Sequence, residues 1–116
     1  LIIMDLFLNN QSFTAEEVAQ LRNKANGGKR MVISYMSIGE AEDYRYYWQE
    51  HWTNNKPSWI SGENLDWPGN YKVKYWDEQW QGIIYKNQDS YLSKITTAAF
   101  DGVYLDIIDA FEYFED

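Results

Sequence analysis

Three short apolar segments of this chain each end in an acidic residue, and this pattern limits the folds open to it. They cover residues 1–5, 31–40 and 102–106 and end at Asp5, Glu40 and Asp106. Runs this short and rich in Val, Ile and Tyr are typical of strands buried on both faces, as in a parallel sheet. Parallel strands carry their chemistry at their carboxyl ends, where the following loops converge. The three carboxylates therefore predict the floor of an active site.

A capping motif predicts the first helix. Thr14 and Glu17 have the spacing of a capping box, in which each side chain bonds the backbone at the other residue. The apolar residues that follow keep helical spacing, and the pair Gly27 and Gly28 is typical of a helix end. We expect a helix over residues 15–26, between strands at 1–6 and 31–37.

A long polar and aromatic connection, residues 39–76, separates the second strand from a second helical pattern. Within it, residues 71–76 alternate like a short strand. Asp77 is a candidate N-cap for a helix over residues 78–98, which Asn87–Asp89 can break in two. The last strand is expected at 102–107.

These elements alternate as strand, helix, strand, helix, strand, and we expect every strand to be parallel. The fold class predicted is α/β: part of a (β/α)8 TIM barrel, with parallel strands and flanking helices. Such a barrel needs about 250 residues, so 116 residues would form a fragment of one barrel domain without its C-terminal half. The chain starts inside a strand-like segment, with neither Met nor a signal-peptide pattern, which also indicates an excised piece. No GxGxxG or GxxxxGK motif follows a strand, which disfavours a nucleotide-binding fold.

Composition excludes several classes of function. The net charge of −8 argues against nucleic-acid binding, which depends on Lys and Arg. The absence of Cys rules out disulfides, cysteine zinc sites and thiol nucleophiles within the chain. No apolar run approaches the roughly 18–20 residues of a membrane span.

Aromatic residues make up 18% of the chain, and all of the Trp residues fall between Trp48 and Trp80. Each ring can fill the core. A long insertion with this many rings also suits carbohydrate, because aromatic faces pack on sugar rings while Tyr and Trp keep a polar atom.

Asp106 is the leading candidate for catalysis, although capping a helix or pairing with a cation would also explain it. Asp109 can share the site or cap the next helix, and Asp101 is more typical of a turn. Around the second strand, Gly39 lets the chain turn so that Glu40 lies over the barrel mouth. Arg45 can pair with an acid there and lower the pKa of that acid.

Other residues of this region have two readings. Glu42 and Asp43 fit either a site or a solvated helix start, and Asp5 either a substrate contact or a support for Arg45. His51 stands alone without a GxSxG motif, which favours a surface or packing role. A Mg²⁺ or Ca²⁺ site made of Asp5, Glu40 and Asp106 is an alternative without EF-hand spacing.

Several motifs together resemble the endo-α-1,4-polygalactosaminidase-type glycoside hydrolases of family 114. The matching stretches are Ser37-Ile-Gly-Glu-Ala-Glu-Asp-Tyr-Arg45, Trp67-Pro-Gly-Asn-Tyr71, Val73-Lys-Tyr-Trp-Asp77 with Trp80, and Phe100-Asp-Gly-Val-Tyr-Leu-Asp106. They cover essentially the whole chain in the family's order. The resemblance implies a TIM barrel and the hydrolysis of galactosamine-containing polysaccharide outside the cell or at its surface. It also implies a catalytic Asp at the end of the fourth strand, matched by Asp106, and a second acid on a later strand.

We therefore predict a glycosidase in which Asp106 is one catalytic carboxylate and Glu40 is its partner or a substrate-binding group. The predicted substrate-binding residues are Asp5, Tyr35, Ser37, Arg45, Trp76, Tyr104 and Asp109. No cofactor or metal is expected, the partner is a polysaccharide, and the oligomeric state stays open. The alternatives are a non-catalytic carbohydrate-binding barrel and a metal-dependent hydrolase that uses the same carboxylates.

Overall fold

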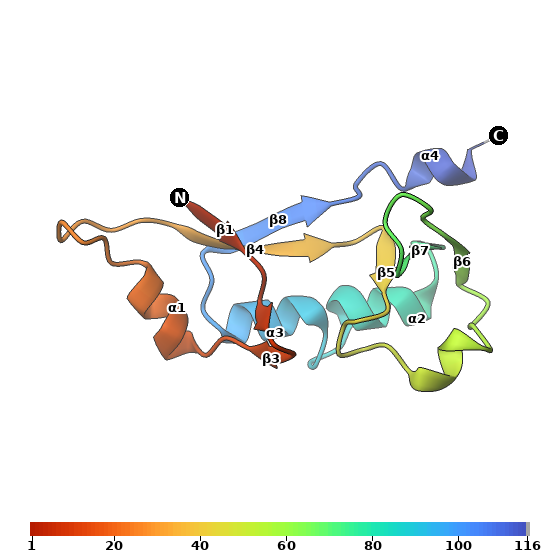
Figure 1. Cartoon of the computed structure of the whole chain (residues 1–116), viewed down its shortest axis with the longest axis horizontal. Helices are drawn as coiled ribbons and strands as arrows, with labels where there is room; N and C mark the ends of the chain where they lie inside the picture. Colours follow the sequence, from red (N-terminus) through yellow and green to blue (C-terminus); the bar gives the residue numbers. More distant parts are fainter. Residues whose placement is uncertain (116) are drawn as a thin grey trace.

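A three-stranded parallel sheet organises the fold, in the computed structural model that describes residues 1–115 (Figure 1). Its strands are β1 (Ile2–Met4), β4 (Val32–Ser37) and β8 (Gly102–Asp106), in the order β1-β4-β8. Ile2 lies opposite Val32 in β4, and Ser37 at the other end lies opposite Asp106 in β8. The three predicted strands and their parallel pairing are confirmed.

The two faces of this sheet differ in burial. Along β4, Val32, Ser34 and Met36 are buried, whereas Ile33 and Tyr35 are only half-buried. Helices α2 and α3 lie on one side of this sheet (Figure 1), and Val32 and Met36 share one core cluster with Ile84 and Ile95. The opposite face, which carries Tyr35, stays accessible. Residues alternate between the two faces along a strand. Strand β4 therefore contributes buried residues on one face and the accessible Tyr35 on the other.

The first helix, α1 (Ala15–Leu21), starts as predicted but is shorter. The Glu17 N–H bonds the Thr14 hydroxyl at 3.2 Å, and the Thr14 N–H bonds the Glu17 carboxylate at 2.9 Å, which completes the capping box. The helix was expected to reach residue 26. It ends earlier because Lys24 and Gly28 close a turn, in which Gly27 has a left-handed φ of 86°.

The expected helix over residues 78–98 is interrupted. It consists of α2 (Glu78–Gln81), a π-helical turn η2 (Gly82–Lys86) and α3 (Tyr91–Thr97), and Asp77 caps its start as predicted. Asn87 has an extended backbone, and the Ser90 hydroxyl accepts a hydrogen bond from the N–H of Ser93. The polar residues after η2 thus begin a new helix rather than continue the first.

The expectation that every strand is parallel is wrong for the long connection. There β5 (Glu40–Glu42), β7 (Asn70–Val73) and β6 (Ile60–Glu63) form an antiparallel sheet in the order β5-β7-β6. The predicted strand at 71–76 corresponds to β7, which starts and ends earlier. The hairpin turn between β6 and β7 contains Gly69 at a φ of 93°.

Short elements complete the described chain. They are the antiparallel hairpin of β2 (Phe7–Leu8) and β3 (Gln11–Ser12), the 3-10 helix η1 (Glu50–Thr53) and α4 (Phe111–Phe114). No helix among residues 1–115 has the length and apolar character that crossing a bilayer requires.

The aromatic insertion supplies both core and surface. Trp59 and Trp80 are buried with their ring centroids 5.5 Å apart, and Tyr47 meets Trp80 edge to face at 5.7 Å. Trp67 and Trp76 are exposed instead. Packing therefore explains part of the aromatic content and leaves the exposed rings to other roles.

Asp101 links three elements at the amino end of the parallel sheet. Its carboxylate accepts hydrogen bonds from the Arg22 side chain, at the end of α1, and from the Val32 N–H at 2.8 Å. These two bonds lower the pKa of Asp101. A lowered folded-state pKa stabilises the fold above the unfolded pKa of ~3.9, and that stability is lost as the pH falls through the folded value.

We therefore expect Asp101→Asn to lower the melting temperature at pH 7 and to have a much smaller effect near pH 3. Thermal unfolding of the protein that carries this chain, at both pH values, measures the difference. Asp66→Asn is the matched control, because Asp66 is exposed and its carboxylate accepts no hydrogen bond from residues 1–115. An equal effect of Asp101→Asn at both pH values would contradict the linkage.

Candidate active site

A cleft of about 490 Å³ lies at the carboxyl ends of the parallel strands. Its polar lining consists of Asp5, Tyr35, Glu40, Glu42, Tyr44, Arg45, Asn70 and Asp106. Trp67 adds a ring that is 67% exposed. The predicted gathering of Asp5, Glu40 and Asp106 at one end of the sheet is thus observed, and the antiparallel sheet forms the opposite wall.

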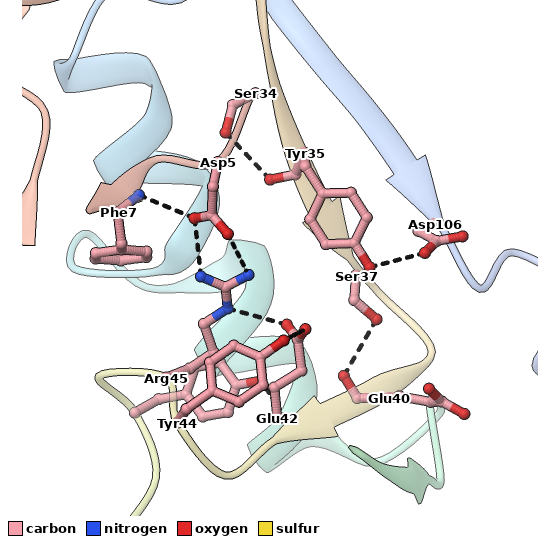
Figure 2. A network of polar contacts seen from close by, with 11 residues as sticks. Asp5, Phe7, Ser34, Tyr35, Ser37, Glu40, Glu42, Tyr44, Arg45 and Asp106 are labelled. Carbon is pink, nitrogen blue, oxygen red and sulfur yellow. Dashed lines mark hydrogen bonds and ion pairs between the residues drawn. The ribbon is translucent and has the colours of Figure 1, made fainter. Parts of the chain in front are cut away.

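Asp106 is held in place through both of its carboxylate oxygens. The Tyr35 hydroxyl, on the neighbouring strand β4, donates to Oδ2 at 2.7 Å (Figure 2). The N–H of Ile107 donates to Oδ1 at 3.0 Å. The carboxylate is half-buried, so it is oriented by the protein and still accessible from the cleft.

Tyr35 remains a hydrogen-bond donor throughout the neutral pH range. Burial raises the pKa of its phenol, and the hydrogen bond to Asp106 raises it further. The proton of this hydrogen bond therefore stays on the phenol, and Asp106 always meets a donor at this oxygen.

The segment after Asp106 is pressed against the turn that follows β4. A Cβ atom at Gly39 would lie 2.3 Å from the carbonyl oxygen of Ile107 and 2.5 Å from Cβ of Ala110. Gly39 is therefore required for close approach, whereas the sequence predicted a role in turning the backbone. Ile107 itself has a φ of 59°, a costly conformation for a β-branched residue. The contact fixes the turn that precedes Glu40 against the segment that follows Asp106.

Arg45 joins two of the acids in a buried network (Figure 2). Its Nη1 and Nη2 atoms each donate to one oxygen of Asp5 at 2.8 Å, and its Nε donates to Glu42 at 3.0 Å. Tyr44 also donates to Glu42 and lies against the guanidinium, 4.9 Å from Cζ to its ring centroid. Burial alone lowers the pKa of Arg45, but the bonds to Asp5 and the charge of Glu42 outweigh it and raise that pKa. Arg45 is a permanent cation between two carboxylates.

Glu40 lies in the cleft wall but is paired. Its side chain is 1% exposed, and its Oε2 accepts from Lys72 Nζ at 2.8 Å and from the Asn64 amide at 3.0 Å. This carboxylate is thus buried and compensated, unlike that of Asp106.

The structure brings five of the predicted site residues together, namely Asp5, Tyr35, Glu40, Arg45 and Asp106. The other four lie outside the cleft lining. Ser37 is buried and donates to the carbonyl oxygen of Glu40, and Trp76 packs its ring edge to face on Phe114 at 4.9 Å. Tyr104 and Asp109 are exposed on and after β8. Their roles in substrate binding stay predictions.

Four polar or aromatic lining residues were not among the predicted site residues: Glu42, Tyr44, Trp67 and Asn70. Glu42 was detectable, because residues two apart in a strand share a face, and Glu40 and Glu42 do so in β5. Their common face becomes visible only when residues 40–42 are recognised as a strand rather than a helix start. Trp67 and Asn70 belong to one of the motifs that carry the family resemblance, but nothing in the sequence indicated that they line the cleft.

The alternative metal site receives no geometric support from these side chains. Within residues 1–115, no three His, Asp or Glu side chains converge as metal ligands. The carboxylates of Asp5 and Glu40 are instead neutralised by Arg45 and Lys72.

The model of the glycoside-hydrolase family GH114 matches residues 1–116. Three uncharacterized proteins are similar in sequence. One from Methanocaldococcus jannaschii is 46% identical over 104 residues, which are 90% of this chain and 28% of that protein. One from Thermotoga maritima is 49% identical over 81 residues, 70% of this chain and 24% of that protein.

The third, from Deinococcus radiodurans, is 41% identical over 112 residues, 97% of this chain and 34% of that protein. The chain therefore spans about a quarter to a third of the length of these relatives. Among solved structures, the crystal structure of Aspergillus fumigatus Ega3 in complex with galactosamine is similar, with a TM-score of 0.63 and 24% identity. The match covers 95% of this chain and 38% of Ega3, and it shows a shared fold.

The buried pair of Glu40 and Lys72 leads to a stability prediction. Lys72→Met leaves a buried carboxylate without its cation and should lower the free energy of unfolding by roughly 3 kcal/mol. Glu40→Gln should cost less, because Gln still accepts from Asn64 and the partly exposed Lys72 can be hydrated. Chemical denaturation of both variants and of the double variant measures the coupling. If the double variant is less stable than Lys72→Met alone, this account of the pair is wrong.

Proposed function

The chain belongs to glycoside hydrolase family GH114, and from this premise we propose that it supplies one catalytic carboxylate, Asp106, to a glycosidase that cleaves galactosamine-containing polysaccharide. The observation that carries the proposal is the state of Asp106: accessible from a cleft and oriented through both of its oxygens. The fold around it is proposed to be part of a (β/α)8 barrel.

Glycoside hydrolysis needs two carboxyl groups, one to protonate the leaving oxygen and one to act as base or nucleophile. Asp106 can take either of these roles, because its carboxylate is accessible from the cleft. Glu40 was predicted as its partner or as a substrate-binding group, but burial and the bond to Lys72 make Glu40 the weaker choice for a group that exchanges protons. A second acid on a later strand, as the family resemblance implies, suits the pair better. Glu40 then keeps the cleft wall in place.

The charge of the cleft supports an amino sugar as substrate. Asp5, Glu40, Glu42 and Asp106 bring four carboxylates, which are opposed by the two cations Arg45 and Lys72. A galactosamine unit with a free amino group is a cation at neutral pH, and an acidic cleft attracts cations and raises their association rate. The exposed ring of Trp67 at this cleft offers an apolar face to a sugar ring.

The proposed polysaccharide substrate also supports a location outside the cell or at its surface. A long hydrophilic polymer does not cross a bilayer unaided, so we propose that the enzyme acts outside the cell or at its surface.

Asp106→Asn tests the catalytic role. We expect turnover of a galactosamine polymer to fall below detection while the melting temperature and sugar binding stay close to the wild-type values. The amide has the same shape and can still accept the Tyr35 hydrogen bond, but it can neither give nor take the proton that hydrolysis requires. Release of reducing sugar is the measurement, on the protein that carries this chain.

Glu16→Gln is the matched carboxyl-to-amide control, because Glu16 is exposed on α1 and remote from the cleft lining. Retained turnover in Asp106→Asn would remove Asp106 from catalysis. A wild-type protein that binds the polymer without releasing reducing sugar would favour the non-catalytic carbohydrate-binding alternative, and loss of activity with EDTA would favour a metal-dependent hydrolase.

Tyr35→Phe tests how Asp106 is positioned. The variant keeps the ring and removes the hydroxyl that donates to Oδ2. Hydrogen bonds to charged groups are worth about 1.5–3 kcal/mol, so we expect kcat to fall by roughly 10- to 100-fold. KM should change little, since the hydroxyl is engaged with Asp106 rather than free for substrate. A rise in KM at constant kcat would instead assign Tyr35 to substrate binding.

A further inference from the structure

A second cavity, of about 400 Å³, adjoins the cleft that contains Asp106. It is lined by Asp5, Phe7, Asn9, Asn10, Tyr44, Arg45 and Tyr46. Three of these residues, Asp5, Tyr44 and Arg45, also line the catalytic cleft. The two cavities therefore meet at these side chains, and the hairpin of β2 and β3 closes the far end of the second one.

The lining of this second cavity has the chemistry of a sugar site. Tyr44 and Tyr46 are 55% and 42% exposed, so parts of both rings remain open to solvent. Asn9 and Asn10 contribute two exposed amides, each of which can donate and accept hydrogen bonds to sugar hydroxyls. The side chain of Asp5 is 40% exposed even though it is paired with Arg45, which leaves it able to meet a cationic amino group.

The cavity is preformed rather than assembled by a flexible loop. Asn9 and Asn10 have φ values of 52° and 65°, which is the geometry of a tight two-residue hairpin turn. The N–H of Phe7 is bonded to Asp5 at 2.9 Å, and the Phe7 ring packs on Tyr46 and Tyr91 at 5.7 and 5.9 Å between centroids. Arg45, which holds Asp5, thus anchors both cavities at once.

We infer that this cavity is a distal subsite, which binds a second sugar residue of the same amino-sugar polymer while another residue lies at Asp106. The inference rests on the proposed function and adds to it the direction in which the polymer leaves the cleft, past Tyr44 toward the hairpin tip. Binding there strengthens the hold on long chains and contributes nothing to substrates too short to reach it.

The double substitution Asn9→Gly and Asn10→Gly tests the subsite. Glycine adopts positive φ without strain, so the turn is kept and only the amides are lost. We expect kcat/KM for long galactosamine oligomers to fall about tenfold, the equivalent of two neutral hydrogen bonds, and kcat/KM for the shortest cleaved oligomer to stay unchanged. Gln11→Ala is the control, because Gln11 is exposed on the same hairpin and lines neither cavity.

A second measurement uses binding without turnover. In an Asp106→Asn background, wild-type Asn9 and Asn10 should give an affinity that rises with oligomer length, and the double glycine variant should lose that rise. Equal losses for all lengths, or no loss for any, would overturn the subsite while leaving the proposed function intact. A wild-type protein that neither cleaves nor binds galactosamine oligomers would overturn the proposed function itself, and the subsite with it.

Discussion

The site depends on one buried cation. Arg45 bonds Asp5 at the end of the parallel strand β1 and Glu42 in the antiparallel strand β5, and these residues come from two sheets that share no strand. Two carboxylates left in this environment without a cation would repel each other and lose hydration, which costs several kcal/mol per ion. The same guanidinium that compensates them therefore fixes the distance between the sheets, and with it the width of the cleft. Lys72, opposite Glu40 in the neighbouring strand β7, compensates the Glu40 carboxylate within the antiparallel sheet.

The elements that local chemistry dictates were predictable from the sequence. The three parallel strands follow from short apolar runs, and the start of α1 follows from Thr14 and Glu17, because these signals act within a few residues. The polar residues Asn87–Asp89 indicated the break after η2. The early end of α1 was less visible, because it depends on a polar segment that competes with the helix by forming a turn. The gathering of Asp5, Glu40 and Asp106 was predictable because parallel strands bring their carboxyl ends together.

The features that could not be predicted from the sequence depend on pairing between residues far apart in the chain. The antiparallel sheet joins β5 to β7 across residues 43–69, which include η1 and β6, and this pairing alone decides that Glu40 meets Lys72. The prediction for Glu40, a catalytic partner or a substrate-binding group, therefore did not include the pairing of its carboxylate with Lys72. Trp76 and Tyr104 illustrate the same limit, because residue type marks a ring as suited to sugar but does not tell which cavity the ring faces. Gly39 was correctly predicted to matter, because glycine lets the backbone turn. The structure gives a different reason, which is the close approach of Ile107 and Ala110.

The contact between Gly39 and Ile107 has a consequence for how the site responds to a ligand. Since the carbonyl oxygen of Ile107 occupies the space that any Cβ at position 39 would need, neither loop can shift without displacing the other. The strain at Ile107 is then compensated by the fold as a whole, and the direction of the neighbouring Asp106 carboxylate is settled before any ligand binds. Enzymes with such preorganised groups spend little binding energy on rearrangement in the reaction itself. A residue without a side chain, Gly39, thus permits the alignment of a carboxylate on another strand.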